Sequence, residues 1–226
     1  MPATRTKSVP IADQASLARI GARVRARLVS DPAVYQVSCE QAEIFAVSDF
    51  LSAAERDRLI AMIDHVARPS PVYGGPDAAN YRTSFSGDVD PGDSVVQMIN
   101  RRICDLMGIE QSWSETFQGQ RYQPGQEFQG HYDWYDTTAD FWPGEVTRGG
   151  QRSWTAMAWL NEVEEGGETR FSRLGIGFPP QAGSLLMWNN ALPDGSPNFD
   201  VLHAGMPVIK GVKYIITKWF RTRPWS

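Results

Sequence analysis

The sequence predicts a mainly β fold with helices packed on one side, and three observations support this prediction. From residue 114 onward the chain is a series of short β-type runs separated by turn residues, the pattern of an antiparallel sandwich or barrel. Several of these runs are apolar on both faces, so at least one sheet must be covered. Segments with helical periodicity are concentrated in the first half of the chain and are the expected cover.

Length and charge restrict the domain organisation and the partners. A chain of 226 residues can bury one substantial core, so we expect a helical extension at residues 1–41 followed by one domain at 42–226. The formal net charge of −4 lacks the clustered basic excess of nucleic-acid-binding proteins. No apolar run is long enough to cross a bilayer. We therefore expect neither a nucleic-acid partner nor a membrane partner.

The first expected helix lies within residues 13–31, where apolar residues recur at steps of three and four: Leu17, Ile20, Val24 and Leu28. Residues 1–30 are rich in arginine and poor in acids, which suits a basic surface helix and also an organelle transit peptide. The start lacks the apolar core of a secretion signal. The two cysteines form no CxxC pair, which favours a reducing cytoplasm.

A strand and two more helices are expected next. Residues 32–51 alternate and contain β-branched residues, which predicts a strand. Ser52 and Glu55 have the spacing of a capping box at the start of a helix over 52–67. A loop rich in Pro and Gly at 68–80 and an extended segment at 81–87 follow. The third helix, within 94–109, is indicated by the apolar positions Val96, Met98, Ile99, Ile103 and Met107.

The second half of the chain supplies the sheets. We expect β-structure in the runs 114–123, 127–135, 152–163, 167–174, 184–190, 199–205 and 211–220. The segment "DFWPGEVTRGGQR", residues 140–152, is expected to be a loop long enough to serve as a lid.

One histidine and acid pair suggests a metal site. His131 and Asp133 stand two apart in an expected strand, so their side chains share a face and could bind one ion. Such pairs also occur by chance, and on this motif alone a solvated surface pair is the better explanation. His65 lies near a helix end, where a histidine commonly interacts with the last carbonyls. His203 precedes a turn and a later strand, so it is the better third ligand.

Two histidines and one carboxylate leave an open face on a metal, the arrangement of non-haem Fe(II) sites that activate oxygen. The same donors also suit Zn²⁺ and a hydrolase. An oxygenase with a dicarboxylate co-substrate such as 2-oxoglutarate would need a buried cation. Strand alternation places Lys213 on one face with Ile215, Thr217 and Trp219. Periodicity alone leaves open whether that face points inward or toward solvent.

Eight stretches connect this chain to a known family: "AEIFAVSDFLSAAERDRLI", "RTS", "RYQPGQEFQGHYDWYD", "GGQR", "LNEVEEGGETRF", "LLMWNN", "PDGSPNFDVLHAGMPVIKG" and "KYIITKWF". Through them, residues 42–225 resemble the catalytic domain of the prolyl 4-hydroxylase family of Fe(II)- and 2-oxoglutarate-dependent dioxygenases. Each stretch is modest evidence, but all eight follow the order of the family. The resemblance implies a double-stranded β-helix, a cupin-like jelly roll, with the N-terminal helices covering one sheet.

The resemblance also implies a set of site residues. The iron ligands would be His131, Asp133 and His203. Lys213, ten residues after the second histidine, would bind the distal carboxylate of 2-oxoglutarate. The remaining residues of the co-substrate pocket and the iron surroundings would be Tyr122, Thr169, Trp219 and Trp159. Residues expected to face the substrate are Arg82, Trp134 and Tyr135.

Three positions depart from the family pattern. Met206 stands where the family usually has a cysteine, which removes a disulfide option. Ser172 stands where a proline is frequent. Trp159 replaces a tyrosine, and its indole N–H can donate a hydrogen bond but not accept one. We expect the change at Trp159 to alter co-substrate affinity and to leave the metal site intact.

The activity implied by the resemblance is hydroxylation coupled to decarboxylation of 2-oxoglutarate to succinate. Fe(II), 2-oxoglutarate and O2 would be required, with ascorbate as a reductant. The family name suggests prolyl residues of a peptide or protein as substrate, and "DWYDTTADFW" could form an aromatic groove. A hydroxylase of free amino acids or other small molecules is the main alternative, and a non-catalytic metal-binding sensor is another. We expect a cytoplasmic monomer or homodimer.

Overall fold

The computed structural model describes residues 13–71 and 81–226. The helices in these ranges are α1 (Gln14–Ser30), α2 (Ala53–Val66), α3 (Ser94–Met107) and α4 (Trp142–Arg148), with two short 3-10 helices at Gln111–Trp113 and Phe199–Val201. The strands are β1 (Tyr35–Gln36), β2 (Ile44–Val47), β3 (Arg68–Pro69), β4 (Phe85–Asp88), β5 (Gln118–Tyr122), β6 (Phe128–His131), β7 (Arg152–Trp159), β8 (Glu165–Gly166), β9 (Thr169–Phe171), β10 (Ile176–Phe178), β11 (Leu185–Asn189), β12 (His203–Gly205), β13 (Val208–Lys210) and β14 (Lys213–Arg221). Most of the predicted loop at 68–80 lies outside the described residues, as do the first basic residues of the chain.

The strands form two sheets that face each other, together with a small ribbon of β13 and β8. The main sheet has the order β1-β2-β11-β7-β14-β5-β4-β3, and the second sheet has the order β10-β9-β12-β6. Neighbouring strands are antiparallel throughout both sheets. β14 lies at the centre of the main sheet, between β7 and β5. The predicted mainly β architecture is confirmed.

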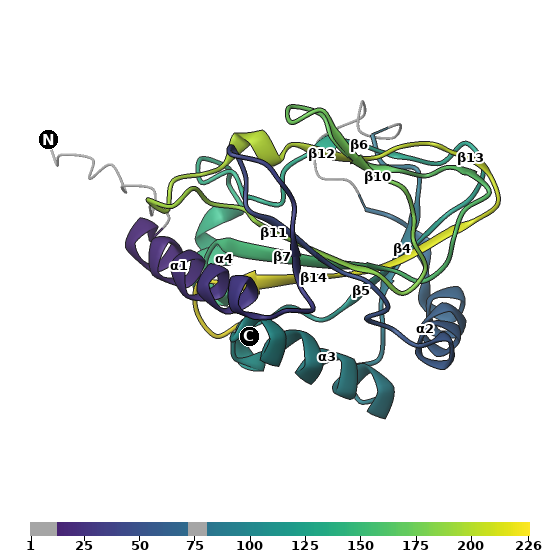
Figure 1. Cartoon of the computed structure of the whole chain (residues 1–226), viewed down its shortest axis with the longest axis horizontal. Helices are drawn as coiled ribbons and strands as arrows, with labels where there is room; N and C mark the ends of the chain where they lie inside the picture. The colour runs from purple at the N-terminus through teal and green to yellow at the C-terminus, as the bar shows by residue number, and fades with distance from the viewer. Residues whose placement is uncertain (1–12, 72–80) are drawn as a thin grey trace, which may run out of the picture.

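Helices cover the face of the main sheet that lies away from the second sheet. Figure 1 shows α1, α2 and α3 on one side of β7, β14 and β5, with β6, β12 and β10 on the other. The shared apolar core includes Ile20 and Val24 of α1, Ile63 of α2, Ile103 of α3 and Ile216 of β14. The helical extension predicted for residues 1–41 therefore contributes, through α1, to the same core as the sheet.

The start of α2 follows the sequence prediction. The Ser52 hydroxyl accepts a hydrogen bond from the Glu55 backbone N–H, and the Glu55 carboxylate accepts one from the Ser52 backbone N–H. This confirmed capping box satisfies two backbone donors that would otherwise lack partners. Gly119 of β5 lets α2 approach closely, because a Cβ there would lie 2.3 Å from Cγ1 of Ile63.

Some predicted elements are corrected by the structure. The expected lid loop at 140–152 contains the helix α4, whose Trp142 is 1% exposed and therefore anchors the segment to the body of the protein. Pro143 lies in the first turn of this helix, where a missing backbone N–H costs nothing. Met98 was expected on the buried face of α3, but its side chain is 42% exposed. The run 199–205 is a 3-10 helix followed by a short strand.

No helix within the described ranges is both long enough and apolar enough to span a membrane.

Candidate active site

The three expected metal ligands lie together between the two sheets. His131 ends β6 and His203 begins β12, and the two strands pair so that these histidines stand opposite each other. One ligand atom from each of His131, Asp133 and His203 lies within 4.8 Å of the others. The prediction that Asp133 lies in a strand is wrong, because β6 ends at His131 and Asp133 follows in a bend. The bend directs its carboxylate toward Thr155 of the main sheet.

Both imidazoles are oriented by the backbone. Nδ1 of His131 lies 2.9 Å from the carbonyl oxygen of Gln129, and Nδ1 of His203 lies 3.0 Å from that of Val201. Because a carbonyl oxygen only accepts, each Nδ1–H is the donor, and each Nε2 keeps a free lone pair. This is the usual outer support of a metal-binding histidine. The ring of Phe128 stacks on His131 at a centroid distance of 3.6 Å.

The carboxylate of Asp133 is buried and held in place by neighbours. It is 4% exposed and accepts a 2.6 Å hydrogen bond from the Thr155 hydroxyl, which itself accepts one from Asn190. Burial alone would raise the pKa of Asp133, but the nearby His203, His131 and Arg152 and the Thr155 hydrogen bond hold that pKa below its ordinary value. Asp133 is therefore an anion at neutral pH.

The imidazole of His131 is neutral at pH 7. Burial, together with the neighbouring His203, lowers the pKa of His131 to about 3. A neutral imidazole offers its lone pair to a metal without first losing a proton. Two imidazole nitrogens and one carboxylate oxygen form the donor set expected for Fe(II) with open positions, so the residues present fit the metal.

Lys213 lies on the face of the main sheet that looks toward the second sheet, so the inward register is confirmed. Its side chain is 1% exposed, and its Nζ lies 3.4 Å from Oγ1 of Thr169 and 5.2 Å from the ring centroid of Tyr122. Burial lowers the pKa of Lys213 to about 7, with the charge of Glu168 acting in the opposite direction. Among residues 13–71 and 81–226, no carboxylate forms an ion pair with this amine. The structure thus places a buried cation beside two predicted pocket residues.

A row of polar groups continues from this lysine along the inner face. The Tyr122 hydroxyl donates to Oε1 of Gln120 at 2.7 Å, and Nε2 of Gln120 donates to the Thr217 hydroxyl at 3.1 Å. All three side chains are buried. The phenol of Tyr122 is therefore oriented by a fixed network rather than by solvent.

Trp219 lies on the same face of β14 and packs against an arginine that the sequence analysis did not select. The guanidinium of Arg152 stands 3.9 Å from the Trp219 ring centroid and 4.0 Å from Asp133. Arg152 is held by two hydrogen bonds to the Glu115 carboxylate, at 2.7 and 2.8 Å. The ion pair between Arg152 and Glu115 thus lies next to Asp133, one of the predicted iron ligands.

Trp159 and Arg82 lie at two other positions around the site. Trp159 is the cross-strand neighbour of Ile215 and lines a cavity of about 90 Å³ next to β2. Its buried indole N–H has no hydrogen-bond partner within the described residues. The Arg82 guanidinium stands 4.6 Å from the centroid of the Phe128 ring, the ring that stacks on His131, and it donates to Gln118.

Trp134 and Tyr135 follow Asp133 in the bend, and both are half-buried. The backbone of Tyr135 exchanges two hydrogen bonds with the Gln151 side chain. Its ring lies within 4.8 Å of the guanidinium carbons of Arg152 and Arg221. Tyr135 therefore also connects the bend to the main sheet.

His65 does not join the metal-ligand candidates. It is exposed in the last turn of α2, as expected for a structural histidine.

Four residues that shape the site were missed by the sequence analysis: Phe128, Arg152, Thr155 and Asn190. Arg152 lies in "GGQR" and Asn190 in "LLMWNN", two of the stretches that carry the family resemblance. Thr155 shares the inner face of β7 with Trp159, so strand alternation could have indicated it. Phe128 lies in a third of these stretches, "RYQPGQEFQGHYDWYD", but its role was not indicated because its stacking depends on the conformation of His131.

Comparisons with known proteins agree with this geometry. Residues 117–221 match the model of the 2OG-Fe(II) oxygenase superfamily. Probable prolyl 4-hydroxylase 3 of Arabidopsis thaliana is 30% identical over 199 residues, which cover 77% of this chain and 68% of that protein. Prolyl 4-hydroxylase subunit alpha-1 of Mus musculus is 29% identical over 209 residues, covering 87% of this chain. The match spans only 38% of the mouse subunit.

Solved structures show the same fold. The 2OG complex of the viral collagen prolyl hydroxylase from Paramecium Bursaria Chlorella virus-1 matches with a TM-score of 0.63 and 29% identity, over 79% of this chain and 95% of that one. The predicted double-stranded β-helix is therefore confirmed. With its relatives, its matching superfamily model and its clustered histidines and aspartate, the chain belongs to the prolyl 4-hydroxylase family of 2OG-Fe(II) oxygenases.

Proposed function

We propose that this protein is an Fe(II)- and 2-oxoglutarate-dependent hydroxylase that acts on prolyl residues of a peptide or protein. The observation that carries the proposal is the pairing of two features on one inner surface. Two imidazoles and a carboxylate converge within 4.8 Å, and a buried amine that has no counter-ion among the residues the structure describes lies beside Tyr122 and Thr169. A diacid co-substrate would supply the missing negative charge.

In this proposal the protein holds and orients the reactants. His131, Asp133 and His203 would hold Fe(II), which supplies the oxidising chemistry when it is bound with 2-oxoglutarate and O2. Lys213 and Thr169 would bind the distal carboxylate, because they offer a cation and a hydroxyl in a site closed to water. The Thr155 hydrogen bond keeps the Asp133 carboxylate turned toward the metal position.

The substrate class is supported by the relatives. The viral protein is named a collagen prolyl hydroxylase and the plant relative a probable prolyl 4-hydroxylase. Arg82, Trp134 and Tyr135 are proposed to face the substrate. Arg82 lies against Phe128, and the other two residues directly follow Asp133. Trp219 and Trp159 would line the inner pocket, with indole N–H groups that find no hydrogen-bond partner in the described part of the chain.

The test is incubation of the full chain with Fe(II), 2-oxoglutarate and a library of proline-rich peptides. We expect succinate formation together with a gain of one oxygen atom on a proline, measured by mass spectrometry. Oxidation of free amino acids with no change in the peptides would mean that the substrate is a small molecule and not a prolyl residue of a peptide. Absence of succinate with every substrate would instead favour a metal-binding module without catalysis.

The proposal also includes ascorbate as a reductant, a cytoplasmic location and a monomeric or homodimeric state. Ascorbate follows from the family resemblance alone, and omitting it from multiple-turnover assays tests it. The location is supported by the free thiols of Cys39 and Cys104, which suit a reducing compartment. Light scattering of the purified chain measures the oligomeric state.

A further inference from the structure

β14 carries a second buried lysine, and it faces the other way. Because side chains alternate along a strand, Lys218 points to the helix-covered face, whereas Lys213 points to the inner face. Lys218 is 2% exposed, and no carboxylate within the described ranges forms an ion pair with it. The two buried arginines nearby differ, since Arg152 and Arg221 are both paired with Glu115. An unpaired buried cation is costly, so this position needs a physical explanation.

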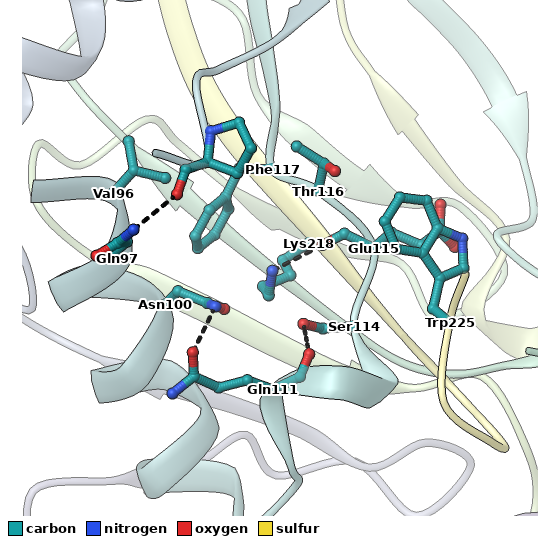
Figure 2. A pocket seen from close by; sticks show the side chains of 11 residues that line it. Val96, Gln97, Asn100, Gln111, Ser114, Glu115, Thr116, Phe117, Lys218 and Trp225 are labelled. Atoms are coloured by element: carbon teal, nitrogen blue, oxygen red, sulfur yellow. Dashed lines mark hydrogen bonds between the residues drawn. The ribbon is translucent and has the colours of Figure 1, made fainter. Parts of the chain in front are cut away.

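The Lys218 amine lines a cavity of about 170 Å³ between α3, the 3-10 helix Gln111–Trp113 and the segment that leads into β5. Figure 2 shows it near the centre of this cavity, with α3 on one side and Trp225 near the C-terminus on the other. The residues that line this cavity include Val96, Asn100, Thr116, Phe117, Lys218 and Trp225. The cavity lies on the opposite face of the main sheet from the metal-ligand candidates.

Only part of the hydrogen-bonding capacity of this amine is used. Lys218 donates one 2.7 Å hydrogen bond to the carbonyl oxygen of Glu115, and its nitrogen stands 4.3 Å from the centroid of the Phe117 ring. An ammonium group has three donors, so two N–H groups remain. The Thr116 hydroxyl lines the same cavity and makes no hydrogen bond within the described residues. Burial lowers the pKa of Lys218 to about 8, which leaves the amine mostly protonated at pH 7.

We propose that this cavity binds a small monocarboxylic acid, with the carboxylate on Lys218 and Thr116 and the hydrocarbon part against Phe117, Trp225 and Val96. The site is separate from the proposed oxygenase centre and does not depend on that activity. A carboxylate would accept the two remaining N–H groups and neutralise the buried charge. The aromatic and aliphatic walls would remove the short hydrocarbon tail from water.

Charge and size favour this class of ligand over larger anions. A single ammonium balances one negative charge, whereas the second charge of a phosphate would stay buried without a partner. At about 20–30 Å³ for each non-hydrogen atom, the cavity holds roughly six to eight such atoms. Propionate and similar short acids fit within this limit.

The test is calorimetric titration of the full chain without added metal, using propionate and, separately, inorganic phosphate at constant ionic strength. The matched variants are Lys218→Met, which removes the amine of the cavity, and Lys210→Met, which removes an exposed amine of β13. We expect the wild type and Lys210→Met to bind propionate with the same affinity, and Lys218→Met to bind at least tenfold more weakly. Phosphate should bind the wild type more weakly than propionate.

Three results would overturn the proposal. They are unchanged binding in Lys218→Met, an equal loss of binding in Lys210→Met, and phosphate binding as tight as propionate binding. A second variant guards against a folding defect in Lys218→Met. Asn100→Phe fills the cavity from α3 and keeps the lysine, so it should also abolish binding while the circular dichroism spectrum stays native. If Asn100→Phe still bound propionate, the binding site could not be this cavity.

Discussion

The two faces of the main sheet are built from the same strands but follow opposite rules. Apart from the buried Lys218, the helix-covered face is largely apolar, with residues such as Ile216 and Phe220 of β14 packed on α1, α2 and α3. The inner face buries Gln120, Lys213 and Thr217 among aromatic rings. The first arrangement lowers the free energy of the folded chain through hydrophobic burial. The second costs free energy unless ligands complete its hydrogen bonds and charges.

This contrast separates stability from chemistry within one sheet. Changes at the apolar positions of the helix-covered face should lower the free energy of unfolding and leave the affinities for Fe(II) and 2-oxoglutarate intact. Changes at the polar positions of the inner face should weaken those affinities and have less effect on the free energy of unfolding. Each prediction below tests this separation.

The largest effect is expected at the metal-ligand candidates. His203→Ala removes one of three ligands, so Fe(II) affinity should fall by more than about 100-fold, since even outer supporting residues contribute 10- to 100-fold. Equilibrium metal titration measures this. His65→Ala is the matched control, because His65 is exposed on α2 and should leave the affinity unchanged. Equal losses in both variants would mean that His203 has no special role.

Removing the inner cation should affect the co-substrate alone. In Lys213→Met the distal carboxylate of 2-oxoglutarate would lack its charge partner, a penalty of about 3–5 kcal/mol, or a few hundred-fold or more in affinity. The measurement is the 2-oxoglutarate dependence of succinate formation, together with a metal titration that should be unchanged. Lys210→Met, at an exposed lysine of β13, is the control. An unchanged 2-oxoglutarate requirement in Lys213→Met would remove this residue from the pocket.

On the helix-covered face, Ile103→Ala should cost about 2–5 kcal/mol in the free energy of unfolding, because Ile103 is fully buried in α3 and a cavity would remain. Urea denaturation measures this loss. Affinity for 2-oxoglutarate, measured well below the unfolding transition, should stay within twofold of the wild type. A large loss of affinity would show that the two faces are not independent.

The hydrogen bond from Thr155 to Asp133 allows a finer test of the inner face. Thr155→Val keeps the shape and removes the 2.6 Å bond, so metal affinity should fall about 10- to 100-fold. Met157→Leu, a neighbour on the same face of β7, changes no polar group and serves as the control. Equal metal affinity in Thr155→Val and wild type would assign Thr155 a packing role only.

The smallest effect is a dependence on pH. The pKa of Lys213 is about 7 in the folded chain and 10.5 when unfolded, so between these values the unfolded state binds more protons. Stability of the ligand-free chain should therefore rise with pH across this window. Affinity for 2-oxoglutarate should fall about fivefold from pH 7 to 8, as the charged fraction falls from about one half to one tenth. Comparing wild type with Lys213→Met isolates this contribution, which the variant should lack.

The sequence predicted the helix-covered face better than the inner face. The positions of α1, α2 and α3 follow from local signals, namely the apolar period and the Ser52 and Glu55 capping box. The helix α4 was missed because its stability depends on the burial of Trp142, a long-range contact that the local sequence, with one proline and three glycines, does not indicate. The exposure of Met98 was missed because an apolar period does not say where the neighbouring elements end.

At the site, the sequence indicated the metal-ligand candidates and Lys213, but the register of β14 needed the three-dimensional structure. Alternation defines which residues share a face, and only packing decides which face is inside. Arg152 was not selected because its place beside Asp133 depends on Glu115, which lies 37 positions earlier in the chain. Family resemblance supplied the roles of Tyr122 and Thr169, which spacing alone would have left as ordinary strand residues.

The alternation of the two lysines along β14 has a consequence for assembly of the sheet. If this strand paired one residue out of step, Lys213 would enter the hydrocarbon layer under the helices and Lys218 would turn into the space between the sheets. Both amines would then lose the partners that surround them now, Thr169 and the Glu115 carbonyl oxygen. A misaligned central strand would therefore leave two amines without their partners, and the free-energy cost of both favours the correct pairing.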